Sequence, residues 1–171
     1  MQDFQNYILG AWGKGEGTET KLYNAINGDL LGEVSSAGID YEAVLKYGRN
    51  VGGPALRKMT FQERGRMLKA LAFYLLEKKA KYYKVSAWTG ATKVDSWIDI
   101  EGGIGNLFAN ASLRKQFPDL PYYIDGVAAP LSKGGSFIGH HIMVPKEGVA
   151  IHINAFNFPV SYTHLRAHET L

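Results

Sequence analysis

Residues 60–76, TFQERGRMLKALAFYLL, give the clearest secondary-structure signal in the chain. They open with a capping box, in which the Thr60 hydroxyl and the Glu63 side chain each satisfy a free amide of the first helical turn. Apolar residues then recur at helical spacing: Met67, Leu68, Leu71, Ala72, Leu75 and Leu76. The pattern predicts a helix.

Two more helices are expected beside it. Asp40 can cap a helix that runs to about Asn50. After a break at 89–92, helical spacing resumes and predicts a helix over about 93–116, through Trp97, Ile100, Ile104, Leu107 and Phe108. The run 102–105, GGIG, lacks the third glycine and preceding strand of a dinucleotide fingerprint, so we attribute its glycines to close helix packing.

Strand signals come before these helices. Residues 7–12 are a short apolar strand candidate, followed by a Gly-rich turn without the ending of a phosphate-binding loop. Residues 22–26 and 30–34 flank Asn27-Gly28, a pair that suits the positive φ angles of a tight hairpin turn. We therefore expect a β-hairpin near the N-terminus.

After the helical segments, the sequence pattern changes to that of a connection followed by strands. We divide it into a hairpin and helices over 1–117, a connection over 118–133 and strands over 134–159. The prolines of 118–130 are typical of an extended surface connection rather than of a helix or strand. Residues 137–144 suit a hairpin arm, and 148–153 suit a buried strand of an incomplete parallel sheet. The expected fold class is α/β.

Composition excludes several classes of protein. The 171 residues, 46% hydrophobic and 20% charged, suit one globular domain. A net charge of +3 is too small to indicate a nucleic-acid partner. No apolar run approaches the roughly 18 residues of a membrane span, and no signal peptide is apparent, so we expect a cytoplasmic protein without a membrane partner. The absence of cysteine removes disulfides, thiolate metal sites and a cysteine nucleophile from the chain.

Two other patterns have ordinary explanations. Lysines and tyrosines alternate over 78–84, which leaves open a nucleic-acid surface, but lysines near a helix C-terminus are favoured by its dipole. His140 and His141 are neighbours on a strand and point to opposite faces, so they cannot readily share a metal ion. His152 has no identifiable partner. We predict no metal site.

The segment 151–159, IHINAFNFP, contains the main candidate for chemistry. Taken locally, Asn157 could simply cap a turn before Pro159. The following residues 160–170, VSYTHLRAHET, resemble the translation of a transposase adapter used to prepare DNA for sequencing. We therefore expect 160–171 to be an artefactual tail, and we assign no function to the helically spaced pair His164 and His168.

Five stretches of the chain, in order, resemble one family. They are NGDLLGEV at 27–34, MTFQERGRMLKAL at 59–71, TGATKVDSWIDIEGGIG at 89–105, PLSKGGSF at 130–137 and HINAFNFP at 152–159. Residues 1–159 resemble the N-terminal part of an aldehyde dehydrogenase domain. Ala155-Phe156 stands where most of the family has Pro-Trp, as in the bifunctional, hydratase-linked branch that degrades phenylacetate.

The resemblance implies oxidation of a semialdehyde linked to coenzyme A (CoA), with NAD or NADP as cofactor, in aromatic catabolism. It implies that Asn157 stabilises the oxyanion formed by cysteine attack on the aldehyde. It further implies that the residues just before Asn157 lie along the cofactor: Ile153, Asn154, Ala155 and Phe156. Homo-oligomerisation is implied as well.

The same resemblance places the family's catalytic cysteine, its catalytic glutamate and its main cofactor-binding lysine downstream of Asn157. We therefore expect the 171-residue chain to be inactive, prone to self-association and without tightly bound cofactor. The alternative is a non-catalytic oligomerisation or interaction module built on the strand segments near 137–153. That alternative predicts a stable isolated fold.

Overall fold

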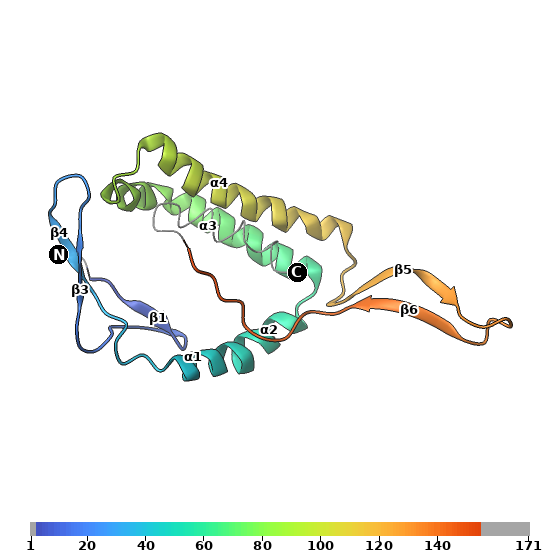
Figure 1. The fold of residues 1–171 in the computed structure, drawn as a ribbon. Helices are drawn as coiled ribbons and strands as arrows, with labels where there is room; N and C mark the ends of the chain where they lie inside the picture. Colours follow the sequence, from blue (N-terminus) through green and yellow to red (C-terminus); the bar gives the residue numbers. More distant parts are fainter. Residues whose placement is uncertain (1–2, 155–171) are drawn as a thin grey trace.

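The computed structural model describes residues 3–154, which form a mixture of helices and short antiparallel hairpins (Figure 1). In chain order the elements are β1 (Asn6–Ile8), β2 (Ala11–Gly13), β3 (Thr20–Tyr23), β4 (Leu30–Val34), α1 (Tyr41–Tyr47), η1 (Gly48–Gly52), α2 (Gly53–Lys58), α3 (Phe61–Trp88), α4 (Lys93–Ser112), η2 (Leu113–Gln116), β5 (Tyr123–Pro130) and β6 (Ile138–Met143). Here η1 is a π-helical turn and η2 a 3₁₀ turn. The expected α/β fold class is confirmed.

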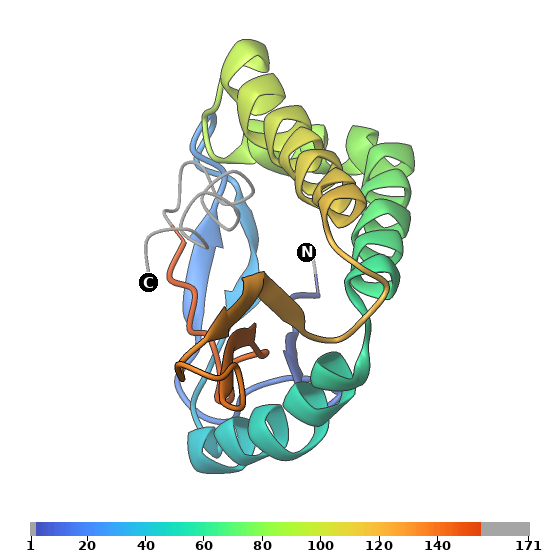
Figure 2. The same ribbon diagram turned by 90° about the vertical axis from the view of Figure 1, so that its right-hand side faces the viewer.

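The long helices α3 and α4 lie side by side, while the N-terminal hairpins and the short helices α1 and α2 form an arc beside them (Figures 1 and 2). The β5–β6 hairpin extends away from the helices. No helix among residues 3–154 is both long enough and apolar enough to cross a membrane.

The helix starts follow the predicted capping chemistry. At the start of α3, the amide of Glu63 donates to Thr60 Oγ1 at 3.2 Å and the amide of Thr60 donates to Glu63 Oε2 at 2.9 Å, which completes the capping box. At the start of α1, the amide of Ala43 donates to Asp40 Oδ1 at 2.9 Å. These side chains satisfy amides that have no partner within the helix. Both predicted N-termini are confirmed.

The core lies between α3 and α4. Ala72 on α3 is buried against Ile100, Ile104 and Leu107 on α4. Leu68, Leu75, Leu76, Tyr82, Tyr83 and Phe108 pack around this cluster. The apolar spacing therefore located most of the core, although Trp97, which shares that spacing, is 56% exposed.

The N-terminal strand prediction over 7–12 is wrong. Two strands stand there, β1 and β2, paired antiparallel with Tyr7 opposite Trp12. Leu9 (φ 51) and Gly10 (φ 84) form the turn between them. Two consecutive positive φ angles are typical of a tight hairpin turn, and leucine is unusual in that conformation. A turn at Leu9 therefore has no recognisable sequence signal.

The pairing of the second hairpin, β3–β4, is confirmed, but the end of its first strand and its loop differ from the prediction. Its first strand ends at Tyr23 rather than near Ile26. A wider loop over 24–29 follows, closed by a 2.8 Å hydrogen bond from the Asn24 amide to the Asp29 carbonyl. Gly28 has the expected positive φ of 76, but Asn27 does not share it. The side chain of Asn27 instead bonds to Asp29.

The prediction of a strand-free connection over 118–130 is also wrong. Residues 123–130 form β5, which pairs antiparallel with β6 from Tyr123 opposite Met143 to Pro130 opposite Ile138. Both strands of this two-stranded sheet are edge strands, where the missing amide hydrogen of Pro130 is tolerated. The predicted hairpin arm over 137–144 is confirmed as β6, and the strand that pairs with it is β5.

The predicted buried strand over 148–153 is absent. The segment has no regular secondary structure, and Ile151 and Ile153 are 75% and 76% exposed. All sheets among residues 3–154 are two-stranded and antiparallel, so no described strand pairs with this segment in parallel. An apolar run becomes a buried strand only where neighbouring strands supply hydrogen bonds and cover its faces.

The helix-packing explanation for the glycines of α4 fails for two of them. Gly103 is buried, but a side chain at Gly102 or Gly105 would meet open space. A close contact is found instead at Gly65, where α3 meets the end of α4 and the η2 turn. A Cβ there would lie 2.6 Å from Arg114 Cδ and 2.9 Å from the Ala111 carbonyl oxygen.

Candidate functional site

The segment that leads to the predicted oxyanion residue lies beside η1 and α2. Arg57 Nη2 on α2 lies 3.6 Å from Glu147 Oε1. Val149 packs on Gly48, where an added Cβ would lie 3.0 Å from Val149 Cγ2. The chain therefore passes η1 closely because residue 48 has no side chain. Figure 1 shows the segment leaving β6, passing α2 and continuing away from the hairpin.

Two of the five predicted site residues lie within the described chain. Ile153 and Asn154 are exposed, and the segment that carries them has no regular secondary structure. Ala155, Phe156 and Asn157 lie outside the described residues. The neighbouring His152 is exposed as well. The assignment of Asn157 to oxyanion stabilisation therefore stays a prediction, as does the cofactor contact of residues 153–156.

A cleft of about 580 Å³ lies at the base of this segment. Its lining residues are Arg49, Asn50, Pro54, Arg57, Glu147 and Gly148. Two guanidinium groups give the cleft positive charge, and the Glu147 carboxylate offsets part of it. No local sequence pattern indicates this cleft, because Arg57 and Glu147 are far apart in the chain.

A smaller cavity of about 330 Å³ lies near the N-terminal strands and is lined by Asp3, Phe4, Lys14, Gly15, Glu19, Glu33 and Ser35. Lys14 Nζ lies 2.6 Å from Asp3 Oδ1, which lowers the pKa of that carboxyl group and raises the pKa of Lys14. A hydrogen bond to Glu33, together with the negative charge of Glu33, raises the pKa of Glu19. Among residues 3–154, no group of three acidic, histidine or cysteine side chains could hold a metal ion.

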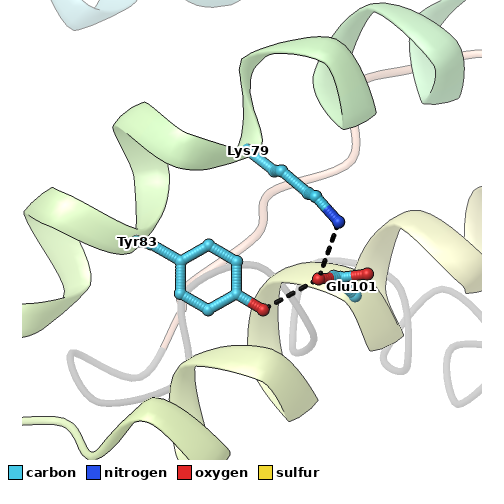
Figure 3. Close-up of polar contacts among 3 residues, drawn as sticks. All are labelled: Lys79, Tyr83 and Glu101. Atoms are coloured by element: carbon cyan, nitrogen blue, oxygen red, sulfur yellow. Dashed lines mark hydrogen bonds and ion pairs between the residues drawn. The ribbon is translucent and has the colours of Figure 1, made fainter.

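A polar cluster of Lys79, Tyr83 and Glu101 joins α3 to α4 (Figure 3). The Tyr83 hydroxyl donates to Glu101 Oε1 at 2.9 Å, and Lys79 Nζ lies 3.1 Å from the same oxygen. These two contacts, that of Tyr83 first, lower the pKa of Glu101. Burial first, and the bond to Glu101 second, raise the pKa of Tyr83. The cluster joins the two helices, so Lys79 and Tyr83 of the run 78–84 have a structural role.

The predicted histidine candidates do not gather into a site. His140 and His141 are exposed neighbours on β6, where successive side chains point to opposite faces. His164 and His168 lie outside the described residues. The whole chain contains no cysteine, so none of its own residues can supply the thiolate nucleophile that the resemblance implies.

Comparison with known proteins identifies the family. The aldehyde dehydrogenase family model matches residues 12–169, so the chain belongs to the aldehyde dehydrogenase family. The chain is also similar to the 3,4-dehydroadipyl-CoA semialdehyde dehydrogenase of Aromatoleum evansii, with 37% identity over 155 residues. That match covers 90% of this chain and 30% of the relative.

The family match has one consequence for the C-terminal residues. It runs to residue 169, past Pro159, where we expected family sequence to end. The adapter origin of residues 160–171 therefore stays a prediction.

Proposed function

We propose that this chain is part of an NAD- or NADP-dependent dehydrogenase that oxidises a CoA-linked semialdehyde to the acid. The observation that carries the proposal is the 37% identity, over 90% of the chain, to a relative named as a CoA-semialdehyde dehydrogenase. The family match supports the oxidoreductase class. The finer assignment to phenylacetate catabolism rests on the Ala155-Phe156 pair and on the ordered stretches that resemble that branch.

The proposed role of Asn157 follows from the charge that develops in the reaction. Attack on the aldehyde carbon places negative charge on the carbonyl oxygen, and a carboxamide N–H held in position stabilises that charge without reorganisation. Loss of such a donor costs about 3 kcal/mol, or roughly a hundredfold in rate. A carboxylate at the same position would repel the oxyanion.

The residues just before Asn157 would hold the nicotinamide cofactor, which accepts a hydride when bound. Ile153 and Asn154 suit such a contact because their segment is exposed and takes part in no strand among the described residues. The Arg57–Glu147 ion pair and the packing of Val149 on Gly48 fix the start of this segment.

The first experiment is to amplify the gene from unfragmented source DNA and to read across codon 159. The proposal expects an open frame that continues into catalytic cysteine and glutamate residues. The full-length enzyme should then reduce NAD or NADP with a CoA-linked semialdehyde, and Asn157→Asp should lower kcat more than Asn157→Gln does. An uninterrupted genomic frame that ends near residue 171 would contradict the proposal.

The same logic predicts that the 171-residue chain alone has no dehydrogenase activity, because it contains no cysteine. Formation of NADH or NADPH would be followed at 340 nm with aldehyde present, and a preparation without the chain is the control. Aldehyde-dependent activity of the purified chain would show that the catalytic assignment is wrong.

A second candidate function is the non-catalytic assembly module. The observation in its favour is the β5–β6 hairpin, which extends from the helices and exposes Val127, Phe137 and Ile138 at 89%, 64% and 61% (Figure 1). Contiguous patches of exposed apolar side chains mark surfaces that bind protein. This candidate predicts a natural stop codon near residue 171, so the gene sequence separates it from the enzyme.

A further inference from the structure

Asn27 is followed by glycine, which makes it chemically different from the other asparagines of the chain. The side-chain carbonyl carbon of an asparagine can be attacked by the backbone nitrogen of the next residue, and a side chain on that next residue hinders the approach. Gly28 has no side chain, so this obstacle is absent at Asn27. The asparagines that precede residues with side chains are Asn6, Asn24, Asn50, Asn106, Asn110, Asn154 and Asn157. Attack on the side chain is therefore least hindered at Asn27.

The fold places Asn27 where the attack is also least restricted by secondary structure. The residue is exposed and lies in the loop 24–29 between β3 and β4. Asn106 and Asn110 lie within α4, where rotation of the backbone toward the side chain would break helical hydrogen bonds. Gly28 has a φ of 76, a conformation that glycine adopts without steric cost. Sequence and location thus indicate the same residue.

Three hydrogen bonds hold the reacting groups while the loop is closed. The Gly28 amide donates to the Asn24 carbonyl oxygen at 2.8 Å. Asn27 Nδ2 donates to Asp29 Oδ2 at 2.8 Å, and the Asp29 amide donates to Asn27 Oδ1 at 3.1 Å. The attacking nitrogen and the leaving nitrogen are both engaged, so the closed loop slows the reaction and an open loop permits it. Exposed loops with few buried contacts open readily.

We propose that Asn27 is a site of spontaneous deamidation. The Gly28 nitrogen bonds to the side-chain carbonyl carbon of Asn27 and loses its proton. The bond from that carbon to Nδ2 breaks, and ammonia leaves with that proton. Water, the other reactant, then opens the cyclic imide at one of its two carbonyl groups and yields aspartate or isoaspartate. No atom is oxidised or reduced.

Deamidation changes the contact between this loop and the helices. A carboxylate replaces the Asn27 carboxamide, so the 2.8 Å hydrogen bond to Asp29 becomes a repulsion between like charges. Isoaspartate also adds a carbon atom to the main chain of the loop. The same loop is joined to the end of α3 by a 2.8 Å bond from the Ala25 amide to the Trp88 carbonyl oxygen (Figure 1). Deamidation therefore loosens the contact between the β3–β4 hairpin and α3.

Peptide mapping by mass spectrometry of the 171-residue chain, incubated at mildly alkaline pH, tests the site. Fragmentation separates Asn27 from Asn24, and a sample taken before incubation gives the baseline. Asn27 should convert from amide to acid faster than every other asparagine. Asp29→Ala should react several-fold faster than the wild type in native buffer, because it frees the Asn27 side chain, and at the wild-type rate in urea. Conversion at Asn27 no faster than at the other asparagines, or no acceleration in Asp29→Ala, would overturn the proposal.

Hydrogen exchange tests the consequence for the loop. Asn27→Asp reproduces the aspartate product, whereas Asn27→Ser, the matched control, lacks both the carboxamide and the charge. The Ala25 amide should exchange several-fold faster in Asn27→Asp than in Asn27→Ser, because repulsion opens the loop. The Ser96 amide, which donates to the Thr92 carbonyl oxygen at 2.9 Å, is the internal reference. Equal exchange of Ala25 in the two variants would contradict the proposed loosening. Neither readout involves dehydrogenase activity.

Discussion

At the scale of single residues, Gly65 sets how closely α3 can approach the end of α4. A Cβ at this position would meet Arg114 Cβ at 2.8 Å and the Ala111 carbonyl oxygen at 2.9 Å, and both atoms are held by the backbone. Glycine in the interior of a helix costs about 1 kcal/mol relative to alanine. Its presence here is therefore explained by the contact rather than by helix propensity.

We predict that Gly65→Ala lowers the free energy of unfolding by about 1–3 kcal/mol, because overpacking against fixed backbone outweighs the gain in helix propensity. Urea unfolding followed by circular dichroism measures the change. Gly102→Ala is the matched control, since a side chain there meets open space and should stabilise α4 by up to about 1 kcal/mol. Similar effects of the two substitutions would show that the contact at Gly65 is unimportant.

Residues of the candidate site differ in how far the sequence could predict them. Asn157 has a strong local alternative as a turn residue, and only the resemblance of neighbouring stretches to one family gives it a catalytic role. The cleft beside Arg57 and Glu147 had no signal at all, because its residues meet only in the folded chain. A site assembled by long-range contacts leaves no spacing that a single sequence can reveal.

At the scale of elements, the helices α1, α3 and α4 were predicted from local signals, whereas only some of the strands were. The signals for α1 and α3 are local, because a cap such as Asp40 or Thr60 acts within one turn of the helix. The strand β5 depends on a partner that lies beyond the next loop, and Pro130 within it, with Pro118 and Pro121 before it, led to the prediction of an extended connection. The segment 148–153 has the composition of a strand but no partner among the described residues. Strand formation therefore depends on information outside the segment itself.

The pair α3–α4 offers a test by pH. The contacts of Glu101 with Tyr83 and Lys79 lower the pKa of Glu101 from its ordinary value of 4.5. A lowered pKa in the folded state means that the contacts stabilise the fold above the unfolded pKa, and that this contribution is lost as pH falls through the folded pKa. Glu101→Gln should therefore be less stable than the wild type at pH 7, and the difference should shrink toward pH 3.

Thermal unfolding at pH values from about 3 to 7 measures this difference, with the ordinary glutamate pKa of 4.5 as the unfolded-state reference. Glu77→Gln is the control, because Glu77 pairs with its neighbour Lys78 at a side-chain exposure of 70%. Exposed pairs contribute little to stability, so its pH profile should follow the wild type. A constant gap between Glu101→Gln and the wild type across this range would contradict the assigned cause.

At the scale of the whole molecule, the described chain buries few apolar side chains and exposes many. The buried apolar residues among positions 3–154 are Ala72, Ile100, Ile104, Leu107 and Ala111, and all lie in α3 and α4. The β5–β6 hairpin carries many of the large exposed apolar side chains, among them Ile124, Val127, Phe137, Ile138 and Ile142. A hairpin with one apolar face needs further packing for stability. This hairpin is therefore a candidate surface for a partner.

We predict that the chain self-associates through β5–β6 and that Val127→Asp reduces this association. Val127 is 89% exposed, so a charge there should disrupt an interface without disturbing the fold of the chain. Light scattering after size-exclusion chromatography measures the mass. Val94→Asp, at a position 64% exposed in the first turn of α4, introduces the same charge away from the hairpin and should leave the mass unchanged. If both substitutions lower the mass equally, association is nonspecific and the hairpin has no particular role.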